Sequence, residues 1–485
     1  MTALPLIDPQ TFETLKDALR AALPEAAVIT NPDRLAALLA EERALFEGNA
    51  TFAVAPATTE ELSIAARLCH AHGVPMVPQG GNTGLVGGAV AKGGEVLISM
   101  TRMNRIRAVD PVNYTMTVEA GAVLADIQNA AAAEGCLFPL SLGAEGSCTI
   151  GGNIASNAGG IGVLKYGNAR ELTLGLEVVL PDGRIWNGMR PLLKDNSGFA
   201  LKHLFIGSEG SVGFVTAAIL KLFPAPAEVQ TAFCALPSPE AALGLLSLAR
   251  RLSGDQVTAF ELLSDFACGI VCDHAGGVFP LSERAPWYAV VELSTSREGS
   301  DLREVFETIL EQGFENGLIE DAVVAETLDQ RDRLWALRER TPEAQKRAGG
   351  SIKHDISVPV SDIPAFIAEA TQAVENYMPG IHPCAFGHVG DGNVHFNFTQ
   401  PDGMDKQAFL EHWDPINEIV YPIAMSFNGS ISAEHGVGLL KADEISAYRP
   451  EIETELNHRL KAALDPAGLM NPGKFVGNVK SQNQS

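Results

Sequence analysis

The sequence is poor in positive charge and in the cysteine patterns that hold metals or clusters. Lys and Arg number 35 against 59 Asp and Glu, which gives a formal net charge of −24 at pH 7 over 485 residues. Such acidity argues against nucleic acid and anionic membrane surfaces as partners, and an anionic substrate would need a locally positive site. The seven cysteines are odd in number and form no CxxC pair, so neither a disulfide framework nor an iron–sulfur cluster is indicated. Any redox chemistry therefore requires a bound organic cofactor.

Long apolar runs and targeting signals are also missing. No uninterrupted apolar run is long enough to span a bilayer. The first thirty residues include Asp8, Glu13 and Asp17, and they have neither the apolar core of a signal peptide nor the Arg-rich character of a transit peptide. We therefore expect a cytoplasmic protein without a membrane span.

The length of the chain predicts more than one domain, because 485 residues exceed what one hydrophobic core usually holds. The Pro and Ala content rises around 222–230, where we place a domain boundary. Beyond it, helices alternate with strands such as 286–294, a pattern typical of an antiparallel sheet covered by helices. The periodicity predicts further strands and helices before the boundary, the strands at 74–77, 95–100, 115–121 and 174–180, and the helices at 59–73 and 123–135.

Glycine is abundant in two segments, 78-PQGGNTGLVGG-88 and 141-SLGAEGSCTIGGNIASNAGG-160. Successive backbone N–H groups in a glycine-rich turn form a concave nest for phosphate oxygens. The Ser, Thr and Asn of the second segment add donors along a flat polar ligand. The first segment lacks the Lys of a P-loop and the GxGxxG motif. A hairpin without a ligand is the alternative for that segment alone, but two such segments in one predicted domain indicate a long cofactor.

Two histidines flank a turn motif in 386-FGHVGDGNVHFN-397. Asp391-Gly392 is a favoured two-residue hairpin turn, and such a turn would place His388 opposite His395, with Asn397 on the same face. Directly opposed residues have Cβ atoms roughly 4.5–5.5 Å apart, close enough for both imidazoles to bind one ion.

A carboxylate and a third imidazole follow in 432-SAEHGVG-438, as Glu434 and His435. Two His and one Glu match an open metal site that leaves positions for substrate. The alternative is a pair of hydrogen-bonded histidines beside an unrelated Glu-His pair.

Positive charge gathers in 335-WALRERTPEAQKRAGGSIKHD-355. Such a segment is either a solvated helix face or the locally positive site that an acidic protein needs for an anionic substrate.

The two glycine segments, together with 207-GSEGSVGFVT-216 and 471-NPGKF-475, resemble the FAD-binding domain of the vanillyl-alcohol oxidase and p-cresol methylhydroxylase superfamily. Within that superfamily the chain resembles, over nearly its whole length, the FAD-linked D-2-hydroxyacid dehydrogenases for D-2-hydroxyglutarate and D-lactate. The resemblance implies an α+β protein in three parts. These are a two-subdomain p-cresol methylhydroxylase-type FAD-binding domain (1–222), an antiparallel-sheet substrate-binding cap domain with the metal-ligand hairpin (223–428), and a helical C-terminal segment that returns to the flavin site (429–485).

The resemblance also implies where FAD binds, with the pyrophosphate held by Gly80 to Gly84. Some relatives attach the flavin through a His in the first loop, but Asn82 and Thr83 stand in that neighbourhood here, so we expect non-covalent FAD. The expected cofactor-binding residues are Pro78, Gly80, Gly81, Asn82, Thr83, Gly84, Leu85, Gly87, Gly88, Ser141, Gly143, Ser147, Thr149, Gly152, Asn153, Ala155, Asn157, Gly159, Gly160, Gly210, Val215 and Asn471.

For the reacting centre, the resemblance implies His388, His395 and Glu434 as metal ligands and His435 as the catalytic base. Zinc fits because it is redox-silent, although manganese and iron accept the same ligand types. Substrate binding would fall on Arg338, Lys353, Asn397 and Thr341. Pro342 stands where we would expect the 2-hydroxyglutarate enzymes to carry a threonine, and Thr341 is the nearest hydroxyl.

The expected reaction is the metal-assisted oxidation of a D-2-hydroxyacid, best D-2-hydroxyglutarate or D-malate, to the 2-oxoacid. Hydride would pass to flavin N5 and the hydroxyl proton to His435. Because the sequence carries no iron–sulfur or haem motif, an external acceptor is required, by analogy electron-transfer flavoprotein or a quinone. The alternatives are a D-lactate or glycolate dehydrogenase or oxidase, and an FAD-binding subunit of a larger oxidase complex. A zinc hydrolase would leave the FAD domain unexplained, and a homodimer is compatible with the sequence.

Overall fold

The computed structural model describes residues 7–41 and 43–476, which form two compact units. Unit 1 contains the chain up to 159, residues 168–224 and the chain from 434 onward. Unit 2 contains residues 160–167 and 225–433. Residues 160–167 therefore cluster with unit 2, although they fall inside the first predicted domain. None of the helices within the described ranges is long and apolar enough to cross a membrane.

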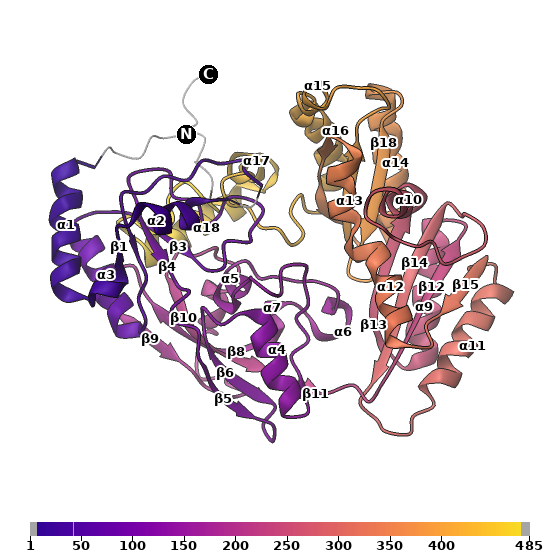
Figure 1. Ribbon diagram of the computed structural model, residues 1–485, viewed down its shortest axis with the longest axis horizontal. Coiled ribbons are helices and arrows are strands. Elements are labelled where there is room, and N and C mark those ends of the chain that lie inside the picture. The colour runs from indigo at the N-terminus through magenta and orange to yellow at the C-terminus, as the bar shows by residue number, and fades with distance from the viewer. Residues whose placement is uncertain (1–6, 42, 477–485) are drawn as a thin grey trace. The chain divides into compact units, whose positions relative to one another are not determined.

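The first sheet of unit 1 has four strands in the order β1-β2-β4-β3. Figure 1 labels three of them, β1, β3 and β4. Both β2 and β3 pair with β4 in parallel, and α3 provides the crossover between them. Helix α3 begins where the Thr58 side chain accepts the amide of Glu61, and it ends before Gly73 at φ +65°. The elements are α1 (Pro9–Ala22), η1 (Glu25–Ala27), β1 (Val28–Ile29), α2 (Pro32–Leu39), β2 (Ala53–Val54), α3 (Thr59–Ala71), β3 (Met76–Gln79) and β4 (Val96–Ser99).

The second sheet of unit 1 has five antiparallel strands in the order β5-β6-β10-β8-β9. Its central strand β10 reads FVTAAILK and is buried except at its last residue, as expected of a strand covered on both faces. The elements are β5 (Ile106–Asp110), β6 (Thr115–Glu119), α4 (Leu124–Ala133), β7 (Cys136–Leu137), α5 (Ile150–Ala155), α7 (Ala169–Leu172), β8 (Thr173–Val179), β9 (Ile185–Gly188), α8 (Lys202–Phe205), β10 (Phe214–Lys221) and β11 (Phe223–Pro224). Two C-terminal helices, α17 (Ala442–Tyr448) and α18 (Glu451–Leu464), also belong to unit 1.

Unit 2 is built on one eight-stranded sheet in the order β15-β12-β14-β13-β18-β19-β16, with β17 paired to β19. Its neighbouring strands run antiparallel to one another. Its strands are β12 (Glu228–Leu236), β13 (Val257–Ser264), β14 (Trp287–Thr295), β15 (Asp321–Val324), β16 (Ser351–Ile352), β17 (Asp355–Ser357), β18 (His382–Gly387) and β19 (Asn393–Thr399).

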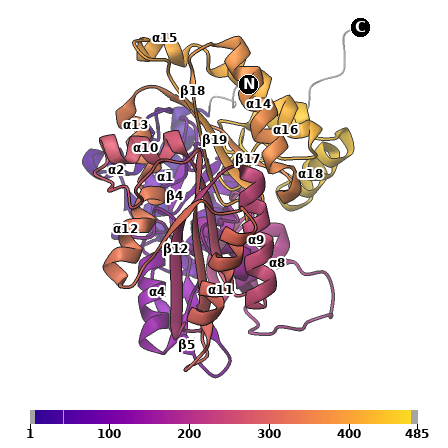
Figure 2. The ribbon, with the colours of Figure 1, turned by 90° about the vertical axis from the view of Figure 1, so that its right-hand side faces the viewer.

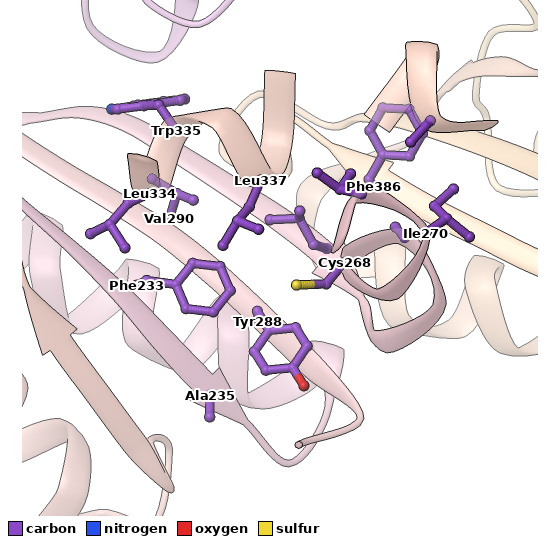
Figure 3. Packing of buried hydrophobic residues seen from close by; sticks show 14 of the residues in the cluster. Phe233, Ala235, Cys268, Ile270, Tyr288, Val290, Leu334, Trp335, Leu337 and Phe386 are labelled. Atoms are coloured by element: carbon purple, nitrogen blue, oxygen red, sulfur yellow. The ribbon is translucent and has the colours of Figure 1, made fainter. Parts of the chain in front are cut away.

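Helices cover both faces of this sheet (Figure 2). The helices are α6 (Val163–Tyr166), α9 (Pro239–Ser253), α10 (Asp265–His274), α11 (Leu302–Glu315), α12 (Leu328–Glu339), α13 (Thr341–Ala348), η2 (Val360–Asp362), α14 (Ile363–Tyr377), α15 (Lys406–Leu410) and α16 (Trp413–Ser426). One face packs against α10 and α12, where Phe233, Tyr288 and Phe386 of the strands meet Cys268 and Leu337 of the helices (Figure 3). The antiparallel sheet covered by helices, expected beyond residue 222, is confirmed.

The strands predicted at 74–77, 95–100, 115–121 and 174–180 and the helices at 59–73 and 123–135 all form, each within two residues of the predicted ends. Local apolar pattern and final structure therefore agree in these segments.

Candidate active site

A large pocket in unit 1 is lined by residues of both glycine segments. Its wall runs from the first glycine segment through the second to residues 205–215, an extent that suits a cofactor as long as a dinucleotide. Two polar atoms in its wall, Thr149 Oγ1 and Glu41 Oε1, are buried and have no hydrogen-bond partner among the described residues. Because buried polar groups normally find a partner, these atoms fit a polar ligand in the pocket.

Glycine is required in the first loop for backbone packing as well as for the approach of a ligand. A Cβ at Gly81 would overlap the carbonyl oxygen of Ser147, which belongs to the second glycine segment. The two segments therefore pack backbone against backbone, and close contact between them shapes the pocket wall. By contrast, nothing lies within 4 Å of a Cβ added at Gly84, so that position leaves open space toward the pocket.

Most of the expected cofactor-binding residues line this pocket, namely Pro78, Gly80, Gly81, Asn82, Thr83, Gly84, Gly87, Gly88, Thr149, Gly152, Asn153, Ala155, Gly210 and Val215. The remaining expected residues are absent from its wall, namely Leu85, Ser141, Gly143, Ser147, Asn157, Gly159, Gly160 and Asn471. Asn471 supports the wall instead, since its Nδ2 donates to the carbonyls of Gly88 at 3.0 Å and Glu209 at 2.8 Å.

His435 lines the same pocket, in the loop that follows the return of the chain to unit 1. The loop is held by Glu209, whose carboxylate accepts the amides of Val437 and Gly438 at 2.6 and 2.7 Å. Glu209 was not predicted as a site residue, although it lies inside the GSEG motif that pointed to the flavin site.

In unit 2, the hairpin register predicted for the histidines is wrong. His395 is paired with Phe386, and residues 388–392 form a loop instead of a two-residue turn. His388 stands one step further along, beside Glu261 of β13, because Leu262 pairs with Gly387. The two imidazole rings nevertheless lie 5.6 Å apart between centroids. The predicted proximity therefore holds for a different geometric reason.

Glu261 is the second carboxylate that the sequence analysis missed. It is 1% exposed, and it accepts from Arg338 Nε at 2.6 Å and from His388 Nδ1 at 2.5 Å. Burial alone would raise the pKa of Glu261, but the charges and hydrogen bonds of His388 and Arg338 outweigh burial and hold the pKa at about 2. The bond to Nδ1 orients the ring with Nε2 outward, as a carboxylate does behind a metal-binding histidine. Arg338 Nη2 lies 3.4 Å from this Nε2, so a cation bound there would have the guanidinium as a neighbour.

Asp355 is a third acidic residue that the motifs did not reveal. It pairs with His395 across β17 and β19, and its Oδ1 lies 3.9 Å from His395 Nδ1. Asn393 Nδ2 donates to the same carboxylate at 3.0 Å. The imidazole and carboxylate of this pair are ligand types that suit zinc, manganese or iron. Glu434 lies one residue beyond Ala433, whose amide donates to the Asp355 carbonyl at 3.1 Å.

The basic segment is not a solvated helix face at Arg338, which is 8% exposed and stacks over the Phe386 ring at 4.9 Å. Lys353 is half-buried between β16 and β17. Asn397 is buried, and its side chain bonds to Gln345 Oε1 and to the amide of His354. Arg338, His388, His395 and Asn397 thus gather on the sheet face that α10, α12 and α13 cover.

Thr341 does not offer a donor to a ligand in this arrangement. It is fully buried, and its hydroxyl donates to the Leu337 carbonyl at 3.1 Å. Pro342 lies in the first turn of α13, where no backbone N–H is needed, so it separates α12 from α13. Because a substrate carboxylate requires a donor, we leave Thr341 out of the proposed site.

Comparison with known families identifies both halves of the chain. Residues 50–188 match the model of an FAD binding domain, and residues 225–475 match the C-terminal domain of FAD linked oxidases. Among solved structures, p-cresol methylhydroxylase has a TM-score of 0.77 at 17% identity, with 98% of this chain and 99% of that chain covered. Alkyldihydroxyacetonephosphate synthase has a TM-score of 0.71 at 16% identity, covering 97% of this chain and 86% of that chain. The fold is therefore that of p-cresol methylhydroxylase-type flavoproteins, as expected.

Curated relatives with higher identity cover almost the whole chain. D-2-hydroxyglutarate dehydrogenase of Xanthomonas citri pv. viticola is 39% identical over 87% of this chain and 88% of its own length. The enzyme of the same name from Stutzerimonas stutzeri is 35% identical over 96% of this chain and 99% of its own length. The mitochondrial enzyme of Danio rerio is 38% identical over 94% of this chain and 84% of its own length.

The glycine-lined pocket and the fold together define an FAD-dependent oxidoreductase. The chain belongs to the FAD-linked oxidase family, in the branch that contains the D-2-hydroxyacid dehydrogenases. The resemblance drawn from the motifs is thereby confirmed.

Proposed function

We propose that the protein oxidises D-2-hydroxyglutarate to 2-oxoglutarate. The observation that carries this proposal is the polar face of unit 2, where Arg338, His388, His395 and Asn397 gather with Lys353 nearby. An otherwise acidic protein thus carries cationic and imidazole groups where an anionic hydroxyacid needs them. The relatives named D-2-hydroxyglutarate dehydrogenase support the choice of this substrate over D-malate, D-lactate and glycolate.

FAD would supply the two-electron acceptor for the hydride from C2. Backbone groups of the two glycine loops and the Thr149 hydroxyl would hold it without a covalent link. His435, in the wall of the same pocket, would accept the proton of the C2 hydroxyl.

We further propose that His388, His395 and Glu434 bind one divalent ion, best zinc, which would supply a Lewis acid for the hydroxyacid group. The support is chemical and comes from the carboxylates beside the two histidines. Glu261 orients His388, and Asp355 stands beside His395. Asp355 is itself a candidate ligand at this ion.

The substrate's distal carboxylate would be held by Lys353 together with the outer nitrogens of Arg338, since Arg338 Nε is taken by Glu261. Electrons would then pass to an external acceptor, by analogy electron-transfer flavoprotein or a quinone. We keep a cytoplasmic location as an expectation from the composition of the first residues, while the relatives from Danio rerio and Arabidopsis thaliana are named mitochondrial.

The variant Lys353→Met tests the dicarboxylate assignment. A charge-assisted hydrogen bond contributes roughly 1.5–3 kcal/mol, so kcat/KM for D-2-hydroxyglutarate should fall by about one to two orders of magnitude. D-lactate lacks a distal carboxylate and should lose much less. Lys346→Met, at an exposed lysine of α13, is the matched control and should behave like wild type.

An equal loss for D-2-hydroxyglutarate and D-lactate in Lys353→Met would contradict the assignment. Arg338 is less suited to this test, because its removal would leave Glu261 buried without its guanidinium partner and destabilise the fold.

A further inference from the structure

The carboxylate of Glu209 connects loops of unit 1 that are far apart in the sequence. Its two oxygens accept the amides of Val437 and Gly438. Its backbone carbonyl accepts Asn471 Nδ2, which also donates to Gly88 of the first glycine loop. Glu209 therefore holds the glycine loop, the C-terminal segment and the loop that carries His435 in one arrangement.

The backbone on both sides of this contact is shaped to allow it. Gly436 has φ +84°, which residues with a Cβ rarely adopt, and a Cβ there would lie 2.7 Å from Glu209 Oε1, so a side chain at this position would displace the carboxylate. Glu209 itself has φ +50°, a conformation that few residues other than glycine adopt, and its own amide donates to the Ala155 carbonyl at 2.8 Å. Such strain persists where surrounding contacts determine it, and it is concentrated at functional sites.

The charge of Glu209 is partly compensated inside the unit. Burial raises the pKa of Glu209 above its ordinary value, although the amides of Val437 and Gly438 and the charges of Arg449 and Lys474 oppose this shift. The two amides bind different oxygens of the carboxylate, whereas an amide side chain offers only one acceptor oxygen.

We propose that Glu209 is a positioning residue that holds His435 at the flavin pocket by fixing the backbone of residues 436–438. Glu209 and His435 both line this pocket, and only one residue separates His435 from the first amide that Glu209 binds. The inference rests on the proposed function, because it takes His435 as the base. Loss of the carboxylate should slow the chemical step more than it weakens binding of flavin or substrate.

Amide hydrogen exchange tests the contact without any substrate. In Glu209→Gln the side chain keeps its shape but has one acceptor oxygen, so its NH₂ group must face one of the two amides. The amides of Val437 and Gly438 should exchange faster than in wild type. Those of Leu439 and Leu440 donate to the Val86 carbonyl and serve as internal controls. Unchanged protection of Val437 and Gly438 would overturn the proposal.

The rate of flavin reduction by D-2-hydroxyglutarate under anaerobic conditions tests the consequence for His435. Displacement of a catalytic group by about 1 Å costs roughly 100-fold, so the limiting rate in Glu209→Gln should fall about 10- to 100-fold, with FAD content per chain unchanged. Glu61→Gln is the matched control, since Glu61 also accepts a backbone amide, that of Ala57 at 2.7 Å, but lies outside the pocket. It should reduce at the wild-type rate.

A wild-type rate per bound flavin in Glu209→Gln would overturn the positioning role, as would loss of FAD without loss of rate. If Glu209→Gln does not fold, Gly436→Ala disturbs the same contact from the loop side and should show the same loss of rate. If wild type is not reduced by any D-2-hydroxyacid, the proposed function fails, and the exchange of the Val437 and Gly438 amides then decides whether Glu209 fixes the loop.

Discussion

At the scale of single residues, motifs predicted the cationic and imidazole groups of the site but not the carboxylates that hold them. Glu261 lies in VTAFELLS, a run typical of a buried strand, and nothing local distinguishes a paired Glu there from an exposed one. Its partners Arg338 and His388 lie 77 and 127 residues away. Because such pairs depend on contacts between distant segments, they become visible only in the folded chain.

The buried lysine Lys474 should make the stability of the protein depend on pH. It is 4% exposed and donates to Asn471 Oδ1 at 2.6 Å, and burial lowers its pKa from 10.5 to about 7 against the opposing charges of Glu95 and Glu209. The unfolded chain therefore binds more protons between pH 7 and 10.5, so this group makes the protein more stable as pH rises through that window. Lys474→Met removes the effect.

Between pH 7 and pH 9, the free energy of unfolding of the wild type should therefore increase relative to that of Lys474→Met, by up to about 2–3 kcal/mol. Chemical denaturation of both proteins at pH 7, 8 and 9 measures this difference. A difference between the two proteins that stays constant with pH would show that Lys474 titrates normally.

At the scale of elements, local rules predicted where strands form but not how they pair. Asp391-Gly392 is a favoured two-residue turn, yet the strands are joined by a longer loop. The cause is the pairing of β18 with β13 on its other side, where Leu263 meets Phe386, and of β19 with β17, where Asp355 meets His395. Strands β13, β17, β18 and β19 together fix the register between β18 and β19. This tertiary pairing overrides the preference of Asp391-Gly392 for a two-residue turn.

The packing of helix α12 is a second feature that local rules could not predict. The helix packs on the sheet through polar pairs as well as apolar contacts. Arg331, Trp335 and Arg338 are spaced at i, i+4 and i+7 and face the same side. Glu292 of β14 accepts from Arg331 at 2.8 Å and from Trp335 Nε1 at 2.9 Å, and Glu261 accepts from Arg338. The sequence of α12 alone reads as a polar surface helix, so its buried face could not be predicted.

Glu292→Gln should therefore destabilise unit 2 by about 1–3 kcal/mol, because Trp335 and Arg331 lose a charged acceptor in a largely buried position. Arg331 is partly exposed, which limits the loss. Chemical denaturation measures the change, and Glu311→Gln, at an exposed position of α11, is the control. Wild-type stability in Glu292→Gln would mean that the apolar contacts of α12 are sufficient.

At the scale of the whole molecule, the family and the fold could be predicted because their signals are local. The glycine segments, GSEG and NPGKF are short motifs, and each identifies the flavin domain through its own residues. The organisation of the site could not be predicted in the same way, since Glu209, Glu261 and Asp355 act on segments distant in the sequence. Motifs therefore identified the chemistry, and the folded chain shows which side chains support it.

The central claim is that D-2-hydroxyglutarate reduces the bound flavin with the help of a metal ion. Its most direct test is the loss of flavin absorbance near 450 nm on anaerobic mixing with D-2-hydroxyglutarate. We expect full bleaching of the purified enzyme by the D enantiomer and none by the L enantiomer. Chelator treatment should abolish the bleaching while FAD stays bound, and added zinc should restore it. A flavin that stays oxidised with D-2-hydroxyglutarate in the metal-loaded enzyme would contradict the assigned substrate, and full bleaching after metal removal would contradict the role of the ion.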